Sequence, residues 1–257
     1  MASKQFAIDW ARQFVGNGDG RVFFRIDAND FLNELEARIN NPKKIFQADA
    51  AVCGPATFLY GLARHRPFGY AHFACWLFMR GSARLGNLNI VAPDNVKNTA
   101  ALHGMGAADW VTLASLRLAR NWVFTEPQNL NKVFFTGVTW PASLTWWLSK
   151  AGYNATNRAN LTITKGWTNW QRACRRHNNG EIVCMFINTN MLSSSLAVRG
   201  TKSSTPNHWI GLANIISERK PVNVEVFTWG DLRTFTFTAA EERNFKRHYY
   251  GYVSAKP

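Results

Sequence analysis

The hydrophobic pattern changes type once along this chain of 257 residues, and that change limits the possible folds more than any other feature. Up to about residue 180, apolar residues recur at the spacing of amphipathic helices, at 6–14, 28–39, 53–66, 70–83, 105–120, 140–151 and 167–176. Afterwards, short apolar or alternating runs predict strands at 182–187, 209–216, 222–228, 232–237 and 250–255, with a brief helix at 239–247. Helices followed by closely connected strands predict an α+β fold with an antiparallel sheet.

The organisation expected from this order is one domain spanning 1–257. It has a mainly helical lobe, 1–180, and a β-rich lobe, 181–257. No Pro-, Gly- or Ser-rich linker separates the two. A hydrophobic content of 46% and an aromatic content of 14% supply ample core material, which excludes a disordered chain.

Membrane and secretory classes are also disfavoured. The longest apolar run, Phe73–Met79, is far shorter than the roughly 20 residues that a membrane span requires. Residues 1–16 predict a polar amphipathic helix with no apolar segment of a signal peptide. Four cysteines are too few for a disulfide framework in a chain of this length, so a reducing compartment is expected.

The chain is strongly basic, with 30 Lys and Arg against 16 Asp and Glu and a net charge of +14. Within 127–240 the acids are limited to Glu181, Glu218, Glu225 and Asp231. A basic face of this kind attracts polyanions, although it also serves solubility alone. The basic residues are scattered and no compact nucleic-acid motif accompanies them, so a nucleic-acid or other binding partner is the alternative rather than the leading hypothesis.

Cys53 is the first candidate for chemistry. It directly precedes Gly54-Pro55, at the predicted start of a helix, where amide N–H groups and the helix dipole favour a thiolate. Gln47 lies six residues upstream, and a curled loop of that length would bring its amide towards an oxyanion formed near the sulfur. The alternative is that Cys53 is a small buried residue at a helix start.

A thiolate nucleophile needs a base, and His208 is the best placed of six histidines. It opens a predicted strand after the polar loop 193–206, where an imidazole can face a cleft. If 208–216 and 222–228 form a hairpin centred near residue 219, the position opposite His208 is close to residue 230. Thr228 and Asp231 are then the candidates to orient the imidazole, and Glu225 ranks below both because it is out of register.

Together these residues resemble the papain-like cysteine hydrolases. The Gln-x5-Cys-Gly-Pro opening is most similar to C39-like peptidases, which cleave bacteriocin leaders. The segment from Val226-Phe-Thr-Trp-Gly to Tyr250-Gly-Tyr-Val-Ser-Ala resembles papain-like toxins and effectors delivered by bacterial secretion machines such as type VI secretion. The similarity covers about 45–66 and 180–257. Phe227 stands where papain has an asparagine two residues before the tryptophan, which leaves the third catalytic residue open.

The resemblance implies a papain-like fold, with Cys53 as nucleophile, His208 as general base and Gln47 as oxyanion donor. Trp229 would shield the histidine. It further implies a cysteine peptidase that acts as a secreted toxin or effector on a protein or peptide substrate, with a peptidoglycan amidase as the alternative. A cognate immunity protein is a partner of such toxins. Export without a signal peptide or a cytoplasmic location fits equally, and no cofactor is expected.

Three other patterns have structural explanations. His72-x-x-Cys75 and Cys174-x-x-His177 place possible zinc ligands one helical turn apart, but apolar neighbours indicate core helices, so no metal is expected. Residues 16–20 are glycine-rich without a preceding strand, which favours a turn over a phosphate loop. A further set of tryptophans favours helix packing over a carbohydrate platform: Trp140, Trp146, Trp147, Trp167 and Trp170.

Overall fold

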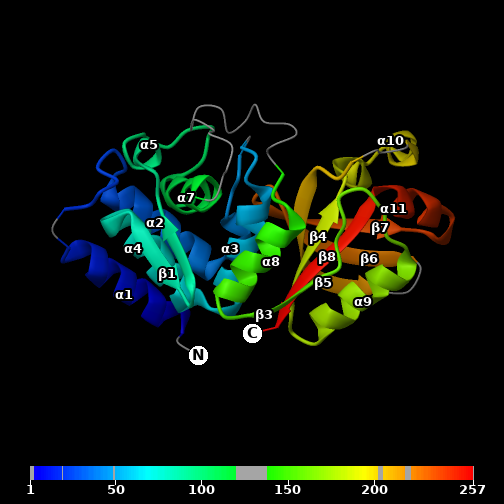
Figure 1. Cartoon of the computed structure of the whole chain (residues 1–257), viewed down its shortest axis with the longest axis horizontal. Coiled ribbons are helices and arrows are strands. Elements are labelled where there is room, and N and C mark those ends of the chain that lie inside the picture. Colours follow the sequence, from blue (N-terminus) through cyan, green and yellow to red (C-terminus); the bar gives the residue numbers. More distant parts are fainter. Residues whose placement is uncertain are drawn as a thin grey trace. The chain divides into compact units, whose positions relative to one another are not determined.

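The structure is a computed structural model that describes residues 3–18, 20–48, 50–119, 138–201, 205–217 and 221–256 (Figure 1). The chain separates into two compact units, Met1–Gly137 and Val138–Pro257. Helices dominate the first and an antiparallel sheet dominates the second, as the α+β prediction requires. The division comes at residue 137, whereas the change of sequence pattern suggested lobes that meet at residue 180. That the two units form one domain stays a prediction.

The first unit is built on four helices of 13 or 14 residues: α1 (Lys4–Gly16), α2 (Ala28–Asn40), α3 (Cys53–His65) and α4 (Pro67–Arg80). Asp27 caps α2 by accepting hydrogen bonds from the amides of Asn29 and Asp30. The shorter elements are η1 (Pro42–Lys44), β1 (Ser82–Leu85), β2 (Leu88–Val91), α5 (Asp94–Lys97), α6 (Ala107–Asp109), a π-helical turn (Trp110–Ala114) and α7 (Ser115–Leu118).

The helix predicted over 70–83 is wrong at both ends. Pro67 occupies its first turn, and Gly81, with a left-handed φ of 67°, ends it. The next residues form the unpredicted hairpin β1–β2, in which Leu85 pairs with Leu88 across Gly86-Asn87. Within the described residues, no helix has both the length and the apolar character to cross a membrane.

The second unit contains a six-stranded antiparallel sheet in the order β3-β8-β4-β5-β6-β7. Strands β4 (Ile182–Ile187) and β6 (Val222–Thr228) have the predicted bounds. The others are β3 (Asn154–Asn157), β5 (His208–Ser217), β7 (Asp231–Phe237) and β8 (Tyr249–Lys256). The helical elements are α8 (Pro141–Lys150), α9 (Trp167–Asn178), η4 (Thr189–Leu192), α10 (Leu196–Gly200), η5 (Ala239–Glu241) and α11 (Glu242–His248).

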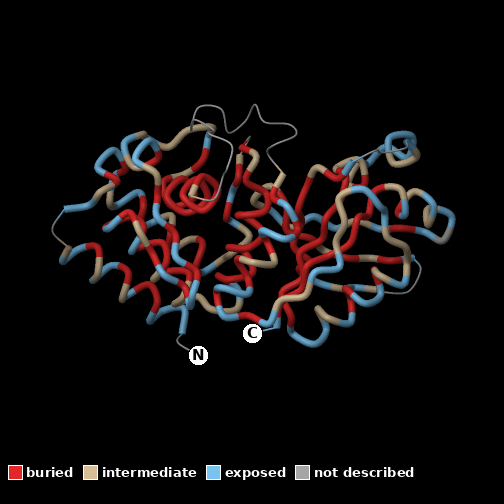
Figure 2. Tube along the Cα trace, in the orientation of Figure 1, coloured by how far each residue is buried: buried red, intermediate tan, exposed pale blue. Residues whose placement is uncertain are grey.

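The main hydrophobic cluster of this unit lies on one face of the sheet, and side chains on the other face, such as Phe186 and Trp209, are buried as well. Every residue of β4 is buried (Figure 2). Trp170 and Cys174 of α9 pack into the same cluster as Phe245 of α11. Trp147 of α8 is buried too, as helix packing predicts, whereas Trp140 is exposed. The central strands of the sheet are therefore packed against buried side chains. Strand β7 is at the edge of the sheet, and most of its side chains are exposed.

Candidate functional site

Cys53 is the first residue of α3, and the helix is buried from Cys53 to Ala63. Its N-cap, Val52, has no side-chain acceptor for the amides of the first turn. The predicted helix start at Cys53 is confirmed, and the positive end of the helix dipole lies at this residue. All four cysteines lie in the described ranges as buried thiols, and none forms a disulfide. Cys53, at 4% exposure, is the one whose surface is not fully covered.

The loop before Cys53 is folded tightly. The amide of Ala50 donates to the Gln47 carbonyl at 3.1 Å, and the amide of Val52 donates to the Ala50 carbonyl at 2.8 Å. Ala48 takes a left-handed φ of 47° within the first turn. Gln47 itself is 7% exposed. The curled loop that the sequence predicted between Gln47 and Cys53 is therefore present, and Gln47 is held in the protein interior.

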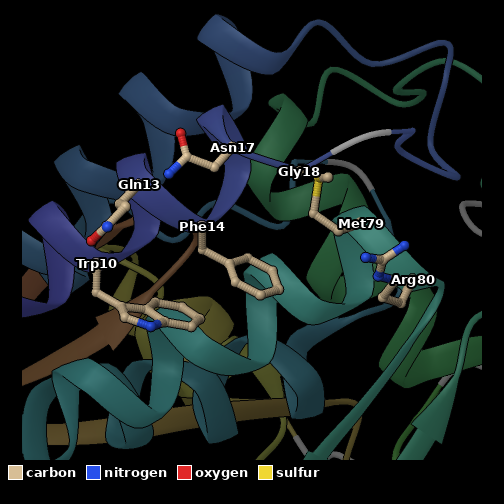
Figure 3. Close-up of a pocket in the computed structure, with 7 residues that line it drawn as sticks. All are labelled: Trp10, Gln13, Phe14, Asn17, Gly18, Met79 and Arg80. Carbon is tan, nitrogen blue, oxygen red and sulfur yellow. The ribbon is translucent and has the colours of Figure 1, made fainter.

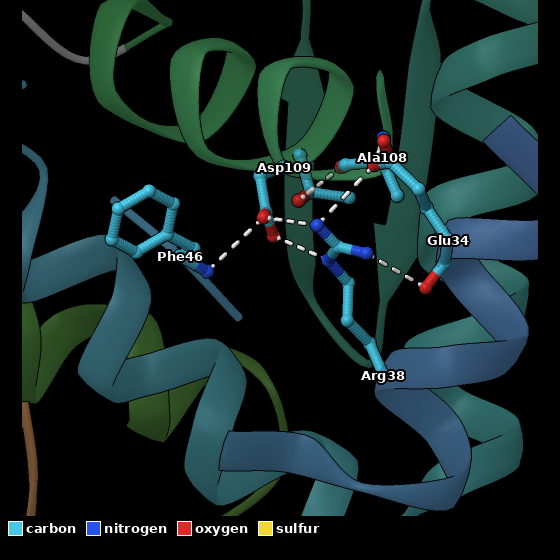
Figure 4. A network of polar contacts seen from close by, with 6 residues as sticks. Glu34, Arg38, Phe46, Ala108 and Asp109 are labelled. Carbon is cyan, nitrogen blue, oxygen red and sulfur yellow. Dashed lines mark hydrogen bonds and ion pairs between the residues drawn. The ribbon is translucent and has the colours of Figure 1, made fainter. Parts of the chain in front are cut away.

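A buried ion pair anchors the start of this loop (Figure 4). Asp109 accepts from Arg38 Nε at 2.8 Å and Nη2 at 2.5 Å, and from the amide of Phe46 at 3.0 Å. Glu34 contacts the same guanidinium at 3.2 Å and accepts from the amide of Ala108. Burial disfavours the charge of Arg38, but the hydrogen bonds and charge of Asp109 outweigh it and raise its pKa. The residue next to Gln47 is thus held by Asp109, which is itself held by Arg38.

Arg117 is a member of the site that the sequence analysis missed. This residue of α7 is only 7% exposed, and burial lowers its pKa while the charge of Cys53 acts in the opposite direction. The interaction is mutual, so the guanidinium favours the thiolate form of Cys53. The available signal was an arginine within the apolar segment 113–118. Nothing in the sequence said that this arginine lies near Cys53.

In the second unit, His208 opens β5 and is 3% exposed. Its Nε2 lies 2.7 Å from Oγ1 of Thr228, the last residue of β6. The predicted register is confirmed at this end of the strand pair, because Gly211 pairs with Phe227. If the same pairing continued three residues further, to the start of β5, residue 230 would lie opposite His208. Thr228 is therefore the orienting neighbour, as a neutral hydroxyl.

Trp229 stacks on the same imidazole, with ring centroids 4.5 Å apart and planes 14° from parallel. It occupies a two-residue turn with Gly230 between the paired residues Thr228 and Asp231. Both turn residues have left-handed φ values, 48° and 74°. Such turns favour Asn-Gly, because a bulky residue is strained there. The fold thus keeps a tryptophan over the histidine despite an unfavourable backbone.

These surroundings make the imidazole neutral. Burial, with a smaller effect from the charge of Arg233, lowers the pKa of His208 to about 3. The Arg233 guanidinium carbon lies 4.9 Å from the centroid of the Trp229 ring, on which it makes a cation–π contact. If Nε2 carries the proton and donates it to Thr228, then Nδ1 keeps the lone pair of a base.

Two other candidates lie differently. Asp231 is exposed at the start of β7, and its carboxylate accepts from the amide of Leu232 at 2.8 Å. Glu225 accepts from Asn214 Nδ2 at 3.2 Å. The structure therefore brings His208, Thr228 and Trp229 together and gives both carboxylates different partners. The predicted hairpin centre near residue 219, the polar loop 193–206 and the basic range 127–240 include residues outside the described ranges.

No group of three potential metal ligands occurs among the described residues. The two predicted helical pairs lie in different units, with His72 and Cys75 in the first and Cys174 and His177 in the second. Burial raises the pKa of Cys75 and so disfavours the thiolate that a metal would need. Compared with known proteins, the chain matches no family model, no curated protein and no solved structure.

Proposed function

We propose that this protein is a papain-like cysteine hydrolase that cleaves amide bonds, with Cys53 as nucleophile and His208 as general base. The observation that carries the proposal is the way in which neighbouring side chains hold the ring of His208. The imidazole is buried, one nitrogen is held by Thr228 and one face is covered by Trp229. Such an arrangement fixes the orientation of a base and keeps water from its rear edge.

In the proposed reaction, Nδ1 of His208 takes the thiol proton of Cys53, and the sulfur attacks the carbonyl carbon of the substrate. The carbonyl electrons move to oxygen, where the Gln47 amide and the Cys53 backbone N–H stabilise the oxyanion. When the C–N bond breaks, the imidazolium protonates the departing amine. A water molecule, deprotonated by Nδ1, then releases the acyl group and restores the thiol.

Two features of the first unit support the nucleophile. The N-terminus of α3 and the buried charge of Arg117 both favour a thiolate at Cys53. The hydrogen bonds of Phe46 and Ala50 hold the backbone on both sides of Gln47, whose side chain is buried. A peptide is the preferred substrate, and peptidoglycan amides would react by the same steps. Delivery as a bacterial toxin or effector remains part of the proposal and rests on the resemblance.

The first test is the pH dependence of alkylation by iodoacetamide, followed for each cysteine by mass spectrometry. Cys53 should react fastest and well below the ordinary thiol pKa of about 8.5, and His208→Ala should slow it. Cys75, Cys174 and Cys184 are internal controls because all are fully buried. A Cys53 that reacts no faster than these three contradicts the proposal.

A second test asks directly whether the two groups meet. The reagent 1,3-dibromoacetone alkylates a thiol first and then a nucleophile a few ångströms away. A Cys53–His208 cross-link is expected in the wild type and should be missing in His208→Ala. Circular dichroism of both proteins controls for folding. Alkylation of Cys53 without a cross-link to His208 would refute the proposed dyad.

A further inference from the structure

Six rings from two helices form a continuous aromatic seam on the first unit. Helix α1 contributes Phe6, Trp10 and Phe14, and helix α4 contributes Phe68, His72 and Trp76. Each set has spacings of four residues, so each lies on one helix face. The ring of Trp10 lies 4.9 Å from Phe14, 5.3 Å from Phe68 and 5.4 Å from His72. None of the six belongs to the buried core, and Phe6 and Trp76 are 53% and 36% exposed.

A cavity of about 450 Å³ borders this seam (Figure 3). Two of its walls are the rings of Trp10 and Phe14, which lie next to each other beneath α1. Gln13 and Asn17 of the same segment contribute amides, and Arg80 contributes a guanidinium from the end of α4. The volume falls within the range of about 300–1,000 Å³ that is usual for small-ligand sites.

The charge of the lining argues against a polyanion. Arg80 is the one ionised side chain among the described lining residues, which are otherwise aromatic, amide, glycine or methionine. Arg12, which is also on α1, is paired with Glu36. A nucleic-acid strand requires several cations along its backbone. The lining therefore favours a ligand that carries little or no charge.

We propose that this cavity binds a pyranose ring of a neutral oligosaccharide. Aromatic rings attract the weakly positive C–H groups of a sugar, and Trp10 and Phe14 line the cavity while they stack on each other. Hydroxyl groups both donate and accept hydrogen bonds, as do the amides of Gln13 and Asn17, while Arg80 adds donors. The proposal does not depend on the hydrolase chemistry, because it uses no residue of that site.

Isothermal titration calorimetry with chitotetraose and cellotetraose tests it on the full chain. At least one probe should bind, with a Kd that changes less than about twofold between low and moderate salt. Gln13→Ala should weaken binding about tenfold without affecting the fold, because Gln13 is exposed. Trp10→Ala should abolish binding. Trp140→Ala, which removes an exposed tryptophan outside the seam, should leave it unchanged.

Three results would overturn the inference. The first is the absence of heat with both sugars at concentrations of about 10 mM, well above the weak affinities of single-sugar sites. The second is binding that survives both Gln13→Ala and Trp10→Ala. The third is that a dT12 oligonucleotide binds with steep salt dependence and loses this binding in both Gln13→Ala and Trp10→Ala, while neither sugar competes with it. Cys53→Ala should leave sugar binding intact, so loss of hydrolase activity and loss of binding are separable.

Discussion

The neutral, buried state of His208 makes a quantitative prediction about acid stability. The pKa of its imidazole is about 3 in the fold, against an ordinary value of 6.5. The folded value is the lower one, so the unfolded chain takes up a proton first as the pH falls below 6.5. The free energy of unfolding should therefore decrease from pH 6.5 down to about 3, by about 1.4 kcal/mol for each pH unit.

At about pH 5, this linkage amounts to about 2 kcal/mol, that is, 1.5 pH units multiplied by 1.4 kcal/mol. The perturbation is His208→Gln, which keeps a polar side chain but removes the titrating group. Other histidines with lowered pKa values, among them His65 and His248, affect both proteins alike. The prediction concerns the difference: between about pH 7.5 and 5, the wild type should lose about 2 kcal/mol more than the variant.

Urea denaturation at the two pH values measures this difference, and an NMR titration of the imidazole Cε1–H measures its origin. The His208 resonance should stay at its neutral position down to about pH 4, while an exposed histidine shifts near 6.5. Equal losses of stability in the two proteins, together with a His208 midpoint above about 6, would refute the reasoning. In that case the ring is accessible to water and Trp229 does not shield it.

Three further substitutions probe other contacts. Arg117→Met should raise the midpoint pH for alkylation of Cys53 by about one unit, because the thiolate loses a buried cation; an unchanged midpoint would show that the charge does not act there. Asp109→Ala should lower the free energy of unfolding by about 3–5 kcal/mol in chemical denaturation, because Arg38 stays buried and keeps only the longer ion pair with Glu34; a loss below about 1 kcal/mol would contradict the buried pair. Trp229→Asn should relieve about 1 kcal/mol of turn strain yet raise the NMR-measured pKa of His208 above about 3, because Asn-Gly suits the turn but covers no ring. An unchanged pKa would mean that the strands alone exclude water.

Local patterns predicted much of the second unit. The apolar run 182–187 and the alternating run 222–228 are strands with these bounds, because both are bordered by turn residues and buried on a packed sheet. The same pattern gave the register that placed Thr228 near His208. It did not choose between Thr228 and Asp231, because that choice depends on the direction of each side chain beside the turn.

Other features were missed because their stability comes from distant partners. Strand β3 has four residues and no clear alternation, and it exists by pairing with β8, about a hundred residues later. The hairpin β1–β2 did have a local signal, the dipeptide Gly86-Asn87, which the apolar helix before it obscured. The interaction of Arg117 with Cys53 links positions 64 residues apart (117 − 53), and no periodicity reports such a contact.

The π-helical turn at Trp110–Ala114 has a consequence for insertions and deletions. It lies between Asp109, which holds Arg38, and Arg117, whose charge acts on Cys53. A π-turn contains one residue more than an α-turn, and each residue rotates the following helix by about 100°. A single-residue deletion here would therefore keep Asp109 on Arg38 while it rotated Arg117 away from Cys53. Over evolutionary time, one codon gained or lost at this turn would change the electrostatic environment of the thiol, and the same rotation would move the buried side chains of Leu116 and Leu118.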